Sequence, residues 1–349
     1  MRVTRALYWS ILAVATIVAA APAVAQEQAG YHVARKLTIG GEGGWDYLVV
    51  DTAARRLFLS RGTHVMVVDL TRDTVVGDIP NTAGVHGIAL VSSLNKGFTS
   101  NGRDSTVTVF DYRTLATTAT IRIPGANPDA ILYEPTSRRV FTFNGRSHDA
   151  TAIDAATNRV VGTVPLPGKP EAANFDGKGN VFVNIEDSVG KVTAFNAQTL
   201  AVSATWTVDG CEEPSGQGID RAHALLFLAC ANNVMAVVHY TSGHEVSAKI
   251  PIGPGTDGAA FDAARGLAFS TNGGDGTLTV IHQDAPDRYT VVGTVATQRG
   301  ARTIALDERT HHVFTVSADF GPAPAPTADQ PRPRRPLIPG TFTVLELEP

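Results

Sequence analysis

A stretch of about forty residues, 128–168, is repeated along this chain, and the repeat limits the folds that the chain can adopt. The stretch holds four short β-prone runs separated by turn-forming residues, which is the arrangement of a four-stranded antiparallel unit. Seven such units follow one another at spacings of 40 to 45 residues, and they begin at Trp45, Val85, Pro128, Pro170, Pro214, Thr256 and Ala301. This period, with four strands in each unit, is typical of a β-propeller. We therefore predict an all-β protein, a seven-bladed β-propeller with four-stranded antiparallel blades.

Two further positions recur in the units. A phenylalanine stands 13 positions after each start, or 12 in the fourth unit: Phe58, Phe98, Phe141, Phe182, Phe227, Phe269 and Phe314. An acidic residue stands six positions after the start in every unit except the second: Asp51, Glu134, Asp176, Asp220, Asp262 and Asp307. We expect the phenylalanines in the second strand and the acids at the turn that leads into it, where a carboxylate accepts backbone hydrogen bonds.

The second strands end in a recurring run. It reads Phe98-Thr99-Ser100-Asn101, Phe141-Thr142-Phe143-Asn144 and Phe269-Ser270-Thr271-Asn272, with a contracted Phe182-Val183-Asn184. This run resembles the YVTN-type propeller repeat, and over residues 31–349 the chain resembles the YncE-like exported bacterial propellers. The resemblance implies the propeller fold and says little about function. Blades 1, 5 and 7 depart from the run.

Residues 1–25 have the pattern of a secretory signal peptide. Arg2 and Arg5 precede an apolar stretch, and Ala23-Val24-Ala25 fits a small-x-small cleavage site. The alternative is a membrane anchor, but the apolar stretch of about 15 residues is shorter than the ~20 that a spanning helix needs. We expect a periplasmic or secreted protein with one domain, residues 26–349, and no membrane span after removal of the signal. Without the two arginines, 27 basic residues face 33 acidic ones, a net charge of −6 that argues against nucleic acid as a partner.

The N-terminal segment can supply the strand that the last unit lacks. The seventh unit stops after its third strand, and residues 31–39 form one strand before the first unit. We predict that this N-terminal strand becomes the outer strand of blade 7 and closes the ring. A proline-rich loop, 321–340, is inserted in the same blade, and we expect polyproline II without regular hydrogen bonds there.

The face where first strands begin and second strands end, called the top face below, is the expected binding face, by analogy with other propellers. The residues just after each unit start should ring the mouth of its central channel: Asp46, His86, Asp129, Glu171, Ser215, Asp257 and Arg302. Such a ring either solvates the mouth, binds Ca²⁺ or Mg²⁺ through oxygens of Asp129 and Glu171, or does general acid–base chemistry with a carboxylate and an imidazole. No other cofactor is evident.

Further candidates lie where second strands end. Asn144 precedes a glycine, which is typical of a turn. Arg146 and His148 follow it, and Arg61 replaces the asparagine in blade 1. These side chains should lie at the rim, and with Arg302 the arginines could hold an anionic group of a ligand.

The two cysteines, Cys211 and Cys230, flank the first two strands of blade 5 on the top face. Because export places the chain in an oxidising compartment, we predict a disulfide between them.

No phosphate-binding loop, zinc-protease helix motif, nucleophile elbow or Cys-x-x-Cys pair occurs in the sequence. Two hypotheses remain. The first is an exported binding or scaffold module that holds a protein or a small molecule on its top face. The second is a lactonase-type hydrolase or lyase with a divalent metal or a carboxylate–histidine pair at the mouth.

Overall fold

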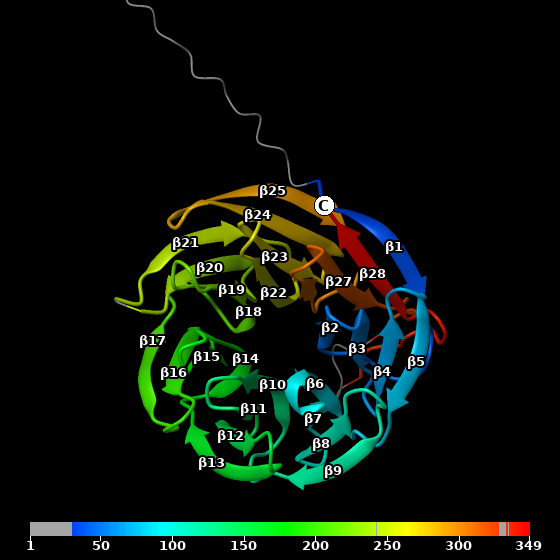
Figure 1. The fold of residues 1–349 in the computed structure, drawn as a ribbon. Helices are drawn as coiled ribbons and strands as arrows, with labels where there is room; N and C mark the ends of the chain where they lie inside the picture. Colours follow the sequence, from blue (N-terminus) through cyan, green and yellow to red (C-terminus); the bar gives the residue numbers. More distant parts are fainter. Residues whose placement is uncertain (1–29, 242, 328–332, 334) are drawn as a thin grey trace, which may run out of the picture.

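The computed structural model describes residues 30–349 except 242, 328–332 and 334. It shows seven sheets of four antiparallel strands around a central axis, so the predicted seven-bladed β-propeller is confirmed (Figure 1). The only helix in the described part is the short 3-10 helix η1 (Ser92–Leu94). None of the described helices is long and apolar enough to cross a membrane. The signal peptide predicted for residues 1–25 lies outside the described residues.

Within each blade, successive strands run from the channel to the outer rim. The innermost strands are β2 (Leu48–Asp51), β6 (Val85–Val91), β10 (Pro128–Glu134), β14 (Lys169–Phe175), β18 (Pro214–Asp220), β22 (Thr256–Asp262) and β26 (Ala305–Asp307). The second strands are β3 (Arg56–Ser60), β7 (Lys96–Asn101), β11 (Arg139–Asn144), β15 (Asn180–Glu186), β19 (Leu225–Cys230), β23 (Leu267–Asn272) and β27 (His312–Ser317).

The third strands are β4 (Val65–Asp69), β8 (Thr106–Asp111), β12 (Asp149–Asp154), β16 (Lys191–Asn196), β20 (Val234–His239), β24 (Thr277–Ala285) and β28 (Thr343–Glu348). The outer strands are β5 (Thr74–Ile79), β9 (Thr117–Arg122), β13 (Arg159–Pro165), β17 (Val202–Thr207), β21 (Val246–Pro251), β25 (Arg288–Ala296) and, in blade 7, β1 (His32–Thr38). Strand β1 pairs antiparallel with β28 from His32–Glu348 to Thr38–Thr343. The predicted closure of the ring by the N-terminal strand is therefore confirmed.

The recurring residues have the roles that their positions predict. The seven phenylalanines are buried, and each belongs to the packing of the blades. The acidic residues accept backbone hydrogen bonds at the turn after the innermost strand. In blade 1, for example, Asp51 Oδ1 accepts from the amides of Ala53 and Ala54, both at 3.1 Å. These repeated turns connect the innermost strand of a blade to its second strand, which runs back to the top face.

The proline-rich loop is tied down at its base. The amide of Gly321 donates to the Pro336 carbonyl at 2.8 Å, and that of Ile338 donates to the Asp319 carbonyl at 2.8 Å. The expectation of a loop without regular hydrogen bonds therefore does not hold at its ends. Two arginines of this loop, Arg332 and Arg334, lie outside the described residues.

The predicted disulfide is confirmed: Cys211 is bonded to Cys230, with 5.3 Å between the two Cα atoms. Cys230 ends β19 and pairs with Pro214 at the start of β18, so the bond fastens the chain entering blade 5 to that blade. Disulfides are typical of proteins outside the reducing cytoplasm.

We expect the double substitution Cys211→Ser, Cys230→Ser to lower the free energy of unfolding by about 3 kcal/mol, because the bond closes a loop of 19 residues in the unfolded chain. Urea denaturation of parent and variant measures the difference. Two thiols that react with a thiol reagent in the denatured, unreduced parent would contradict the bond.

Candidate functional site: the mouth of the channel

A cavity of about 860 Å³ occupies the mouth of the channel on the top face. Its ionisable lining residues are Asp46, His86, Asp129, Lys169, Glu171, Glu186, Asp257, Arg299, Arg302 and Arg335. Six of the seven predicted ring residues are therefore brought together, and Ser215 is the one that does not line the cavity. Trp45, Phe320 and Leu337 add an apolar part to the wall.

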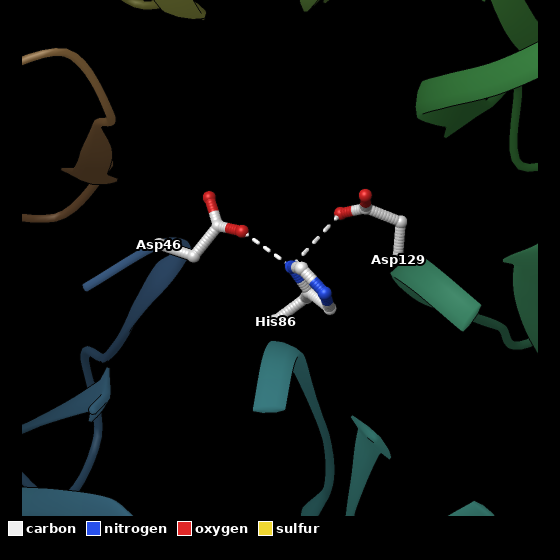
Figure 2. Close-up of side chains that lie close together, drawn as sticks. All are labelled: Asp46, His86 and Asp129. Carbon is white, nitrogen blue, oxygen red and sulfur yellow. Dashed lines mark hydrogen bonds and ion pairs between the residues drawn. The ribbon is translucent and has the colours of Figure 1, made fainter. Parts of the chain in front are cut away.

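One cluster of these groups joins three blades (Figure 2). Nδ1 of His86 lies 2.6 Å from Oδ2 of Asp46 and 3.5 Å from Oδ1 of Asp129, so the imidazole stands between two carboxylates. His86 is the second residue of β6, and Asp129 is the second residue of β10. Burial acts to lower the pKa of His86, but the hydrogen bond to Asp46 and the charge of Asp129 outweigh it and raise that pKa.

Two carboxyl groups of the mouth, those of Asp129 and Glu171, are largely buried. Burial raises the pKa of Asp129 to about 6, although the neighbouring imidazole acts in the opposite direction. Burial and the nearby charge of Asp129 raise the pKa of Glu171 well above its usual range. Oε1 of Glu171 accepts a hydrogen bond from the Tyr47 hydroxyl at 3.2 Å. Both raised pKa values are expected, because burial and mutual repulsion disfavour the charged form of carboxyl groups that lie close together.

Arg302 organises the opposite side of the mouth. Its Nε donates to Oδ2 of Asp257 at 2.8 Å, and its Nη2 donates to the Trp45 carbonyl at 2.9 Å and lies 3.5 Å from Oδ1 of Asp46. The guanidinium also lies 5.8 Å from the centre of the Trp45 ring. Arg302 thus joins blades 7, 6 and 1 and is occupied by protein partners.

The other predicted rim residues do not line this cavity. Asn144 is fully buried, and its amide donates to Asp149 at 2.5 Å and to the Thr151 hydroxyl at 2.9 Å, so it holds the turn after β11. Arg146 and His148 are exposed in that turn. These three residues of blade 3 therefore do not contribute to the mouth cavity.

Arg61 was expected to overhang the mouth, and the structure places it elsewhere. Its side chain is 1% exposed, donates to the carbonyls of Gly40 and Gly43 at 2.9 and 3.1 Å, and lies 3.6 Å above the Phe342 ring. Burial lowers the pKa of this guanidinium to about 10. Because it replaces the turn asparagine of other blades, Arg61 fastens the segment after β1 instead of reaching a ligand.

Sequence reasoning missed Lys169, Glu186, Arg299 and Arg335. One signal for Glu186 was available: it stands 16 positions after its unit start, as Asn144 does in blade 3. The one-residue contraction of the fourth unit drew attention to Asn184, whose amide instead donates to the Gly216 carbonyl at 3.1 Å. Glu186 forms a short ion pair with Lys169, directly across from it on β14.

The arrangement can bind a cation or move a proton. Ligand atoms of Asp46, His86 and Asp129 lie within 4.8 Å of one another, and among the described residues this is the only such group that could hold a metal ion. Carboxylate oxygens suit Ca²⁺ and Mg²⁺, and the added imidazole suits Zn²⁺. Glu171, the partner predicted for Asp129, lies instead next to Lys169, whose Nζ is 3.4 Å from its Oε2.

Comparison with known proteins supports the fold. No protein-family model matches the chain, and no curated protein matches its sequence. A solved structure, that of Kuenenia stuttgartiensis hydrazine synthase, is similar with a TM-score of 0.70 and 14% sequence identity. The similarity covers 79% of this chain and 93% of the other. At this identity the similarity shows a shared propeller architecture only.

Proposed function

We propose that this chain is an exported, periplasmic propeller of the YncE-like, YVTN-repeat kind that serves as a binding module. Its ligand is a small polar molecule held in the mouth cavity of the top face. One observation carries the proposal: a cavity of about 860 Å³ whose wall is built from ionisable side chains of six blades. That volume lies in the usual range for small-molecule sites, and the few apolar residues in the wall suit a polar ligand.

A panel of small sugars, amino acids, organic acids and amines tests this proposal through thermal shifts of the mature protein. We expect at least one member to raise the melting temperature of the parent and to leave that of the double variant Asp129→Ala, Glu171→Ala unchanged. A panel in which no member separates parent from variant would contradict a ligand site at the mouth.

The trio Asp46, His86 and Asp129 supports a second candidate, a lactonase-type hydrolase or lyase. There the imidazole would accept a proton from water or substrate, with Asp46 holding its orientation through Nδ1. Alternatively, the trio would hold a divalent cation that polarises a substrate carbonyl. Both versions use the carboxylate–imidazole contact, and both differ from the binding module in requiring turnover.

The same double variant separates the binding module from the metal-dependent version of the enzyme by its stability. For a binding module without a resident ion, we expect Asp129→Ala, Glu171→Ala to be as stable as the parent or slightly more stable, because repulsion between buried carboxylates is relieved. Added Ca²⁺, Mg²⁺ or Zn²⁺ should change neither melting temperature. Stabilisation of the parent alone by one of these ions, with stoichiometric ion retained through dialysis, would favour the metal-dependent enzyme.

A further inference from the structure

The charges in the mouth cavity are divided between two walls. The wall from blades 1 to 4, here the acidic wall, carries four carboxyl groups against one lysine and one imidazole: Asp46, Asp129, Glu171, Glu186, Lys169 and His86. The wall from blades 6 and 7, here the basic wall, carries three guanidinium groups against one carboxylate: Arg299, Arg302, Arg335 and Asp257. One cavity therefore presents an excess of acidic groups on one side and of guanidinium groups on the other.

The acidic wall contains carboxylates whose charge is poorly matched by the protein. Glu171 is 7% exposed, and its Oε2 accepts no hydrogen bond in the described part of the chain. The nearest cation is Lys169, whose Nζ lies 3.4 Å from Oε2 of Glu171 but closer to Glu186. Among the described residues, Asp129 forms an ion pair only with His86, at 3.5 Å, and that imidazole is bound more closely by Asp46. A buried carboxylate without a full partner is costly, and a cationic ligand group would offset that cost.

The basic wall contains guanidinium groups without carboxylate partners. Arg299 is exposed, and its side chain makes no hydrogen bond or ion pair within the described residues. Arg335 donates to two backbone carbonyls, those of Gly321 at 2.7 Å and Phe320 at 3.1 Å, and pairs with none of the described acids. Arg302, by contrast, is already paired with Asp257. Two cations thus remain available for an anionic ligand group, beside the ring of Phe320.

We propose that the ligand of the mouth is a zwitterionic small molecule. Its ammonium group binds at Glu171 and Asp129, and its carboxylate group binds at Arg299 and Arg335. This inference rests on the proposed function and names the ligand class. A metal ion would satisfy the acidic wall and leave the two arginines unused, whereas a simple organic acid would leave the buried carboxylates unmatched. Only a molecule with both charges uses both walls, and charge-assisted contacts of this kind are the strong ones in a partly dry site.

Matched probes test the inference. Isothermal titration calorimetry on the mature protein would compare ω-amino acids, from 4-aminobutyrate to 8-aminooctanoate, with the carboxylic acid and the amine of the same chain length. We expect the best amino acid to bind about tenfold or more tightly than either partner molecule, since each lost charge-assisted contact is worth at least about 1.4 kcal/mol.

The variant Glu171→Gln keeps the side-chain shape, and Arg299→Gln shortens the side chain but keeps it polar; each removes one ionisable group from its wall. Glu171→Gln should reduce the affinity for the amino acid to that for the carboxylic acid, and Arg299→Gln should reduce it to that for the amine. Glu212→Gln and Arg103→Gln, two exposed residues outside the cavity, are the matched controls and should bind like the parent. Thermal unfolding of each variant checks that the fold is retained.

The outcomes separate this inference from the proposed function. If the carboxylic acid or the amine binds as tightly as the amino acid and Glu171→Gln or Arg299→Gln weakens it, the mouth binds ligands but the zwitterion is wrong. If none of the probes binds, the proposal of a zwitterionic ligand is also wrong, and the thermal-shift panel described above then tests whether the mouth binds any small molecule. Binding that is unaffected by both variants would place the site elsewhere and overturn both.

Discussion

A chain that begins at Gly43, and so lacks β1, is expected to aggregate or to melt far below the parent that begins at Gly30. Without β1, the backbone groups of β28 along the whole pairing from Thr343 to Glu348 are left exposed. An unpaired strand at the edge of a sheet is a template for association with other chains. Loss of several backbone hydrogen bonds at about 1 kcal/mol each, together with buried apolar contacts, amounts to several kcal/mol.

Side chains on this segment also connect blade 7 to both neighbouring blades. The buried Tyr31 packs against Phe269 of blade 6, with ring centres 5.0 Å apart, and its hydroxyl donates to the His311 carbonyl. On the other side, Arg35 bridges Glu346 of β28 and Asp73 of blade 1. The truncation therefore removes the outer strand and both of these cross-links.

Differential scanning calorimetry and size-exclusion chromatography would measure the effect. A synthetic peptide of residues 30–42, added in excess to the truncated chain, should restore part of the lost thermal stability, because it can pair with β28. If the chain beginning at Gly43 unfolds at the temperature of the parent, the ring does not depend on β1.

The architecture was predictable because each blade is encoded by a similar stretch of sequence, repeated every 40 to 45 residues. A buried phenylalanine recurs in all seven units, and an acid that caps the turn after the innermost strand recurs in six of them, so a local deviation in one unit hardly weakens the whole pattern. The closing strand followed from counting, since the last unit is one strand short. The disulfide followed from the placement of two cysteines at neighbouring strand ends.

The mouth was predictable only in part. Spacing identifies the polar residues just after each unit start, and six of these seven do line the cavity. It does not show which way a long side chain turns: Arg61 occupies a rim position yet turns into the protein to reach backbone carbonyls. Nor does it show that Arg335, at the end of a proline-rich insertion, folds back over the mouth through Phe320 and Gly321. Such contacts depend on loop geometry that no repeat encodes.

The substitution Phe227→Ala is expected to lower the free energy of unfolding by about 3–5 kcal/mol. The phenylalanine of blade 5 is fully buried in β19. Its ring stacks on Phe261 of β22 at 4.7 Å between centres and meets Tyr289 of β25 edge-on at 5.8 Å, and both of these rings belong to blade 6. The side chain therefore contributes to the contact between two blades as well as to its own sheet, and its loss leaves a cavity in that contact.

Two further variants serve as references for this effect. Phe227→Leu keeps most of the apolar volume and should cost less than half as much as the alanine substitution. Val202→Ala, at a side chain 43% exposed on the outer strand β17, should change stability by no more than about 0.5 kcal/mol. Guanidinium denaturation followed by tryptophan fluorescence measures all three, and a cost for Phe227→Ala near that of Val202→Ala would contradict the packing argument.

The slope of the denaturation curve adds a test of how the ring unfolds. In a ring closed by β1, one blade cannot leave without exposing the faces of its two neighbours, so the seven blades should unfold as a single cooperative unit. Phe227→Ala should then shift the midpoint and leave the slope unchanged, because the area exposed on unfolding is the same. A shallower slope, or fluorescence and circular dichroism curves that no longer coincide, would show that the contact between blades 5 and 6 opens first. The ring would then unfold from that contact and not as a whole.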